Sequence, residues 1–427
     1  MKWNEKINAG ALQFVLFISV VIALLLLAFV TLSQTNDLFN KKTTLLVHTV
    51  KKTEMGLQFV LNNTLPISDS TQLDLPPDDL SIDLTGIRSH WGVFEKYTVT
   101  ATAKKNRFIK SVLVGHGNQE TPPALYLQDR QRPLIIVGRA AIKGEAYLPK
   151  QGIRPGNISG NAFYGNTLVQ GRQRESKEQL PQLHPGMKTY LNGLLKNRSA
   201  IPITERIRSV NGIKAENSFQ QPTKWLSGTV VDLSGASLRG NIVVRASQRI
   251  IVDASSQLQD VLLVAPTIII KNRSTGIFQA LASRQIEVGK NCNLGYPSAL
   301  ITIKDRNAPK NGNRMQPPAI HLDQGSEISG IVLYLEEKQE ETAFYPQVKL
   351  EKNSRVRGEV YCERNLEHLG QVFGTVYTSG FIALENGSIY QNHLYNGTIE
   401  NEAHPPQYSG LPILGKKQRK TVSKWLY

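Results

Sequence analysis

The chain contains little cysteine, and this scarcity excludes two kinds of small site and scaffold. Its 427 residues include only Cys292 and Cys362, so neither a disulfide-rich scaffold nor a zinc site built from cysteine clusters fits the sequence. One disulfide between the two cysteines stays open. Apolar residues make up 40% of the chain and charged residues 20%, a composition typical of folded protein.

Motifs for catalysis are also absent. The eight histidines show no HExxH or other paired ligand spacing, and no GxGxxG, phosphate-loop or GxSxG motif occurs. Cys362 with His368 hints weakly at a metal site, but a buried cysteine explains the first residue more simply. Asp232, Asp253 and Asp260 are the nearest acidic candidates, and their places beside expected strands favour turns. We therefore expect no enzyme activity, no cofactor and no metal.

One segment lacks charge and proline altogether, and it predicts a membrane helix. Residues 11–32, ALQFVLFISVVIALLLLAFVTL, form a run of 22 residues. As a helix this run is about 33 Å long, enough to cross a hydrocarbon core of about 30 Å. The apolar part of a signal peptide is shorter and ends in small residues. The sequence therefore predicts a single-pass membrane protein with residues 1–10 as a short cytoplasmic leader.

The basic residues around this run do not agree with the expected orientation. Two lysines precede the run and four follow it: Lys2, Lys6, Lys41, Lys42, Lys51 and Lys52. By that count alone the bulk of the chain stays in the cytoplasm, whereas long exported domains cross largely regardless of charge. We expect the bulk of the chain to be extracytoplasmic.

The N-terminus resembles a known family over its first sixty or so residues. A short basic leader that ends at Gly10, followed by Ala11-Leu12 and an unbroken apolar run, resembles the prepilin-type N-terminus of bacterial type IV pilins and type II secretion pseudopilins. The resemblance implies cleavage between Gly10 and Ala11. Val15 departs from it, because most pilins carry glutamate at that place. Residues 33–65 predict a helical stalk, either the second half of a pilin-like helix or a simple spacer.

The rest of the chain predicts a β-solenoid, because a short motif repeats along it. The motif is aliphatic-x-Gly-x-aliphatic, and its six glycines are Gly144, Gly160, Gly240, Gly330, Gly358 and Gly374. Short aliphatic strands also begin at Ile250, Ile268 and Ile286, eighteen residues apart. Such turns stack to bury apolar ladders, and glycine fits where the chain bends beside its neighbour. The repeat resembles bactofilins in pattern only, and whether there is one stack or two stays open.

These observations divide the chain into nine parts within a mainly β fold. After the leader (1–10), the transmembrane helix (11–32) and the helical stalk (33–65), we expect a Pro/Asp-rich linker (66–87), a small β module (88–133), a first solenoid segment (134–169), a polar basic insertion (170–225), the main solenoid (226–400) and a basic tail (401–427). The two loop insertions, 170–225 and 304–318, interrupt the repeats.

The net charge is +16, and its basic residues are spread along the chain before they concentrate at the C-terminus. Lys416, Lys417, Arg419, Lys420 and Lys424 form a basic tail that suits an anionic lipid, cell-wall polymer, polysaccharide or nucleic acid through electrostatics alone. The simpler alternative is a solvated, flexible end.

The sequence favours a membrane-anchored structural or adhesive protein of a bacterial cell envelope, such as a minor pilin-like subunit. Its expected partners are membrane lipid and other envelope or pilus-like subunits, and oligomerisation is open. Two alternatives remain: a membrane-tethered carbohydrate-active β-helix enzyme, and a bactofilin-like scaffold that faces the cytoplasm.

Overall fold

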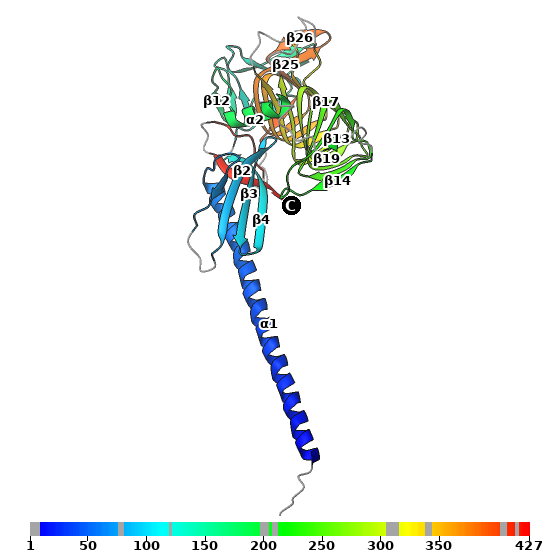
Figure 1. Ribbon diagram of the computed structural model, residues 1–427. Coiled ribbons are helices and arrows are strands. Elements are labelled where there is room, and N and C mark those ends of the chain that lie inside the picture. The colour runs from blue at the N-terminus through cyan, green and yellow to red at the C-terminus, as the bar shows by residue number, and fades with distance from the viewer. Residues whose placement is uncertain are drawn as a thin grey trace, which may run out of the picture.

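A single long helix, α1 (Ala9–Asn62), leads into a β-rich head (Figure 1). The computed structural model describes residues 9–75, 81–118, 122–196, 205–206, 212–304, 316–337, 344–401, 408–414 and 418–427. Every residue from Gly10 to Thr44 is exposed, and the helix first becomes partly buried at Leu45. The expectation of a mainly β protein with one N-terminal apolar helix is confirmed.

The second half of α1 packs against a five-stranded antiparallel sheet. Its strands lie in the order β1 (Ser70–Gln72), β2 (Asp83–Trp91), β3 (Phe94–Ala103), β4 (Asn106–Asn118) and β29 (Gln418–Leu426). The apolar side chains of one helix face and one sheet face are buried together, among them Leu57, Val60, Leu84, Tyr97 and Val99. Burial of this face holds the head on the helix.

The remaining strands wind into a stack of parallel turns, here called the coil. Between β17 and β24, aliphatic residues pair in register at successive turns, as in Ile250↔Ile268↔Ile286↔Ile320. Their side chains are fully buried inside the coil. The hydrogen-bonded strands form one closed network. Its strands are β5 (Leu125–Leu127), β7 (Ala141–Lys143), β8 (Ala146–Leu148), β12 (Gln173–Glu175), β13 (Glu205–Arg206), β14 (Lys214–Asn217), β15 (Lys224–Asp232), β16 (Ser237–Gly240), β17 (Ile242–Val252), β18 (Gln257–Ile270), β19 (Thr275–Val288), β20 (Asn293–Lys304), β21 (Ile320–Leu322), β22 (Glu327–Glu336), β23 (Val348–Leu350), β24 (Arg355–His368), β25 (Gln371–Glu385), β26 (Ser388–Gln391) and β28 (Thr398–Glu400).

The two repeat segments form one continuous stack. β5 pairs with β25, and β7 pairs with β28, so the segment that begins near residue 125 extends the end of the coil that the chain reaches last. The chain then returns to the other end of the coil through a connection that contains α2 (Pro185–Lys196). Smaller pairings lie at the end that contains β5, β7, β25 and β28: β6 (Leu134–Val137) with β9 (Ile153–Pro155) and β27 (His393–Tyr395), and β10 (Asn157–Ile158) with β11 (Asn161–Ala162).

One outer side of the coil is apolar and is covered by the rest of the head. This covered face includes Val243, Leu262, Leu281, Ile301 and Leu333. Met187 and Leu191 of α2 pack on it, as do Trp91 and Phe94 from the β2–β3 hairpin. Gln279 bonds the tip of that hairpin: its Oε1 accepts from Val93 N at 2.9 Å, and its Nε2 donates to Trp91 O at 2.9 Å. The coil and the antiparallel sheet are thus held together by a buried interface.

Three expected boundaries differ from the structure. The linker of 66–87 contains β1 and the start of β2, the small module of 88–133 is one part of a larger sheet, and the tail of 401–427 supplies its last strand, β29. Local sequence carries no signal for the pairing of the tail, because its partner strand β4 lies some three hundred residues earlier.

Candidate functional site

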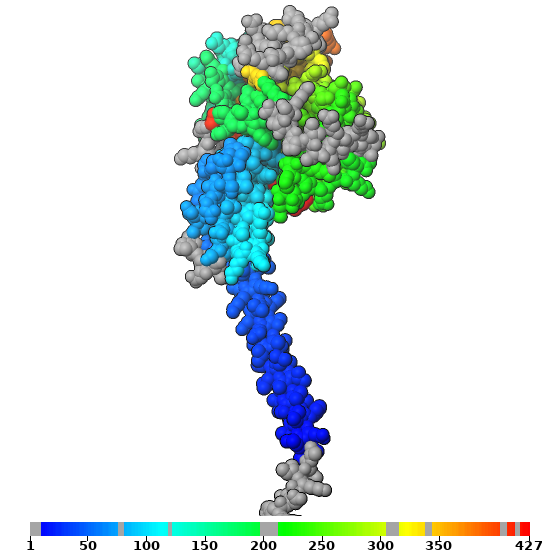
Figure 2. Space-filling model, in the orientation of Figure 1, coloured from blue at the N-terminus to red at the C-terminus, as the bar shows by residue number. Residues whose placement is uncertain are grey.

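The first half of α1 is an exposed apolar surface. Every large apolar side chain from Leu12 to Leu32 is exposed, and Figure 2 shows this part projecting bare from the head. Two of its polar side chains bond within the helix: Ser19 Oγ donates to Leu16 O at 2.8 Å, and Thr31 Oγ1 donates to Ala28 O at 2.9 Å. Such a surface suits a hydrocarbon environment, where each polar group needs a partner from the protein.

The expected processing site lies at the start of this helix. Gly10 and Ala11 are helical and exposed, and a Cβ on Gly10 meets nothing within 4 Å. The leader before them, residues 1–8, lies outside the described part of the chain. The residues on which a peptidase would act therefore have no neighbours in the head that cover them.

The other end of α1 is fixed by the expected basic tail. Lys420 Nζ donates to Val60 O at 3.2 Å and to Asn63 O at 2.6 Å. These carbonyls lie at the helix C-terminus, where a cation is favourable. Burial lowers the pKa of Lys420. Lys420 thus holds the helix to the sheet and is not part of a free, solvated end.

Of the other tail residues, Arg419 and Lys424 lie within the fold. Lys424 Nζ forms an ion pair of 2.7 Å with Asp260, whose side chain is 1% exposed. Arg419 lies in β29, and Lys416 and Lys417 lie outside the described residues. The two described lysines of the tail, Lys420 and Lys424, therefore bind groups of the protein itself. This disfavours the expectation that the tail binds an anionic partner.

Four of the six repeat glycines lie in paired strands of the coil, and Gly144 lies between β7 and β8. Gly330, Gly358 and Gly374 lie in register on successive turns, with φ values of 144°, 143° and 144°. A Cβ on Gly358 would stand 2.0 Å from Gly330 O, so only glycine fits there. Gly240 and Gly144 also have positive φ. Gly160 differs, since it lies in the exposed turn between β10 and β11, where a Cβ meets nothing within 4 Å.

The acidic candidates and the two cysteines have structural partners. Asp232 Oδ1 accepts from Ser234 N at 3.0 Å, and Asp253 Oδ1 accepts from Ser255 N at 3.1 Å, so both belong to turns. Cys292 and Cys362 are free and buried, and burial raises the pKa of Cys362 to about 12. His368 is buried with its Nε2 2.9 Å from Thr398 O, and burial lowers its pKa to about 4. The described residues contain no group of three or more acidic, histidine or cysteine side chains placed to hold a metal.

A second outer side of the coil is partly exposed in the described part of the chain, and it is here called the open flank. Its central row consists of outward residues paired turn by turn: Ile251, Ile269, Glu287, His321, Lys349 and Glu367. Lys349 Nζ lies 2.9 Å from Glu351 Oε1 and 3.4 Å from Glu367 Oε2. A hydrogen bond from His321 and the nearby Lys349 lower the pKa of Glu351 to about 2. Much of this row is therefore neutralised by its own neighbours.

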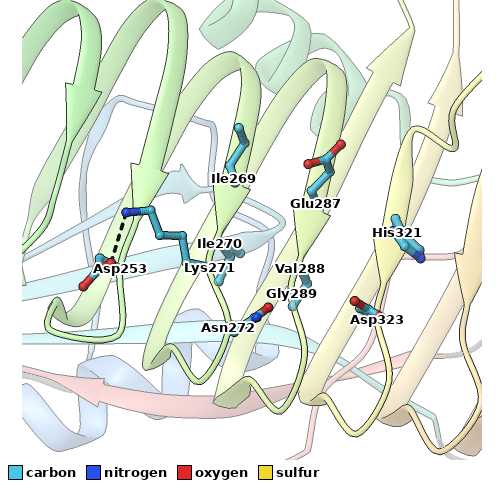
Figure 3. Close-up of a pocket in the computed structure, with 10 residues that line it drawn as sticks. All are labelled: Asp253, Ile269, Ile270, Lys271, Asn272, Glu287, Val288, Gly289, His321 and Asp323. Carbon is cyan, nitrogen blue, oxygen red and sulfur yellow. Dashed lines mark hydrogen bonds and ion pairs between the residues drawn. The ribbon is translucent and has the colours of Figure 1, made fainter.

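Two hollows lie side by side on the open flank, and Ile269 lines both. The acidic hollow, of about 520 Å³, includes Asp253, Lys271, Asn272, Glu287, His321 and Asp323 (Figure 3). The arginine hollow, of about 370 Å³, is lined by Ser247, Gln248, Arg249, Pro266, Thr267, Ile269 and Arg284. Polar side chains from successive turns thus face a shared, shallow surface, which can hydrogen-bond an extended polar chain. The expectations from sequence did not include this surface, although Arg249 and Thr267, which both line the arginine hollow, lie one repeat apart in the chain.

Comparison with protein family models, curated proteins and solved structures finds no match to this chain.

Proposed function

We propose that this protein is a membrane-anchored structural or binding subunit of a bacterial cell envelope, of the minor pilin type. The observation that carries the proposal is the division of α1 into two halves. Residues 10–44 are exposed and include the apolar run, whereas the second half packs on an antiparallel sheet. A helix that is free and apolar at one end and docked at the other supports the pilin resemblance rather than a simple spacer.

The length of α1 supports an anchor that holds the head away from the lipid. Residues 11–32 fill the bilayer, and residues 33–44 remain exposed before the head begins. That stretch of helix is about 18 Å long. The coil lies at the end of the molecule away from the exposed half of α1 (Figure 1). In this proposal the helix serves assembly and anchoring, and the coil presents a surface to partners outside the cytoplasm.

The coil itself is proposed to be a β-solenoid. Three features support this interpretation: parallel pairing of sequence neighbours about one repeat apart, aliphatic ladders in the interior, and glycines stacked at one strand position. In such a fold each turn needs its neighbour to bury its apolar side chains. The bactofilin resemblance concerns this architecture, and the proposal does not extend to filaments.

A binding role is favoured over a carbohydrate-active enzyme. Glycoside cleavage uses a pair of carboxyl groups on either side of one bond. On the open flank, Asp253 is bonded to Ser255 and Lys271, and Glu287 accepts from Gln285 Nε2 at 2.8 Å. These carboxylates are engaged with their own neighbours, which suits a surface that holds a ligand without cleaving it.

Cysteine labelling in intact cells tests the topology. Asn386→Cys places a thiol in the exposed turn after β25, and Asn4→Cys places one in the leader. The native cysteines are both buried, so the background is low. In a host without a prepilin peptidase, where the leader is kept, we expect a membrane-impermeant maleimide to label Asn386→Cys in spheroplasts and Asn4→Cys only after lysis. The reverse pattern refutes export and supports the scaffold that faces the cytoplasm.

N-terminal sequencing tests the pilin resemblance separately. In a host that contains a prepilin peptidase, the mature chain is expected to begin at Ala11. Gly10→Leu is the matched control, because it changes only the residue before the cut, and its chain should begin at Met1. A wild-type chain that begins at Met1 while it is labelled outside the membrane leaves an exported, anchored protein and removes the pilin-like assignment.

A further inference from the structure

Two arginines of the arginine hollow carry charge that the protein does not neutralise. Arg249 and Arg284 are both exposed, and both line the hollow. Within the described part of the chain, neither guanidinium forms an ion pair or hydrogen bond, whereas each has five donors to offer. Two free guanidinium groups on one hollow form an anion-attracting surface.

Several other basic side chains of the coil are paired. Lys271 Nζ lies 3.1 Å from Asp253 Oδ2 across the acidic hollow. Arg355 and Arg357 both approach Glu327, at 3.8 Å and 2.8 Å. Arg249 and Arg284 have no such carboxylate partner among the described residues, and together they leave positive charge in the arginine hollow.

The arginines are spaced across two turns of the coil. Arg249 pairs in register with Thr267, and Thr267 pairs with Gln285, the neighbour of Arg284. Adjacent strands lie about 4.8 Å apart, so the two backbones are separated by about 10 Å. This spacing suits two anionic groups on one extended polymer better than a single small ion.

The chemistry around the arginines indicates which polymer fits. We propose that the arginine hollow is a subsite for the carboxylate groups of an acidic polysaccharide that lies along the open flank. The neighbouring acidic hollow offers Asp253, Asn272 and Glu287, whose oxygen and nitrogen atoms suit sugar hydroxyl groups (Figure 3). No aromatic side chain is among the described residues that line either hollow, so the stacking platform used for single-stranded nucleic acid is missing. The proposal rests on the extracytoplasmic placement of the coil.

Binding of polygalacturonate to the full-length chain in non-ionic detergent tests the subsite. The test variant is Arg249→Gln/Arg284→Gln. The matched control is Arg355→Gln/Arg357→Gln, which removes the same formal charge from arginines already paired with Glu327. At low salt we expect the test variant to bind at least about tenfold more weakly, because two charge-assisted contacts are lost. The affinity of the control for polygalacturonate should stay within about twofold of wild type, because substitutions at distant sites have independent effects.

Three outcomes overturn the proposal. If wild-type protein does not bind polygalacturonate, the proposed ligand class is wrong. If both variants lose affinity equally, the binding reflects general attraction by net charge. Tighter binding of single-stranded DNA, lost in the same test variant, assigns the hollow to nucleic acid. Neutral dextran should not compete. This assay does not depend on membrane orientation, so its failure is distinct from a failure of the topology experiment.

Discussion

Substitution of a single repeat glycine is expected to open the coil locally. In Gly358→Ala, the new Cβ would stand 2.0 Å from Gly330 O of the preceding turn, and φ is 143°. Backbone strain of this kind costs about 1–3 kcal/mol. Relief of the clash separates the two turns and weakens one or two backbone hydrogen bonds, at about 0.5–1.5 kcal/mol each. We therefore expect a loss of about 4 kcal/mol in the local stability of β24.

Thiol labelling of Cys362 measures this opening directly. Cys362 lies in the same strand, its side chain is 0% exposed, and a reagent reaches it only when the turn opens. A loss of about 4 kcal/mol predicts labelling faster by about a thousandfold, since each 1.4 kcal/mol is tenfold. Peptide mapping separates Cys362 from Cys292. Urea unfolding of the whole chain is a poorer assay, because helix, sheet and coil need not unfold in one step.

Gly160→Ala is the matched control from the same sequence motif. Its φ is 85°, but a Cβ there meets nothing within 4 Å. The strain of about 1–2 kcal/mol stays in the β10–β11 turn, so Cys362 labelling should change less than about twofold. An equal increase of the Cys362 labelling rate in both variants would refute the argument that close contact between stacked turns, and not backbone conformation alone, requires glycine at Gly358.

Two further predictions concern the sheet interface and acid stability. Gln279→Ala should lower the stability of the interface between sheet and coil by about 2–4 kcal/mol, because Val93 N and Trp91 O lose their buried partner. Limited proteolysis of the β2–β3 hairpin should then be faster than in wild type, and an unchanged rate contradicts the prediction. The folded protein disfavours a proton on His368, so its pKa of about 4 predicts that stability falls as pH decreases from about 6.5 to about 4, by up to about 3 kcal/mol. Thermal unfolding midpoints across this pH range should be flatter in His368→Gln than in wild type, and parallel curves would exclude His368 as the cause.

The sequence predicted elements whose signals are local. The charge-free run of residues 11–32 predicted the exposed half of α1, and the spacing of Ile250, Ile268 and Ile286 predicted strands that the structure pairs turn by turn. Both patterns can be read from short stretches of sequence, because neighbouring residues share the same surroundings in the folded chain. The motif around Gly160 matched equally well but forms a hairpin turn, because a glycine between aliphatic residues serves an open turn as readily as a stacked one.

Distant pairings were beyond the sequence for a physical reason. Strand β29 pairs with β4, and β5 pairs with β25, across separations of more than two hundred residues. A single sequence shows which residues favour strands. It does not show which strands pair, because the backbone hydrogen bonds between strands are the same for every residue type. For the same reason the sequence alone predicts a basic tail at the C-terminus, although Lys420 binds the end of α1 and Lys424 binds Asp260.

The distribution of apolar residues on the coil explains why its binding surface lies where it does. On the covered face, outward positions such as Leu262 and Leu281 are apolar and hold the sheet and α2. On the open flank, the outward row changes from Ile251 and Ile269 to Glu287, His321 and Lys349. The same repeat therefore supplies one side that must be buried and one that must meet water or a polar partner. Since the arginine hollow lies on the second side, occupation of this hollow by a polymer need not disturb the docking of the coil on the sheet and its anchor.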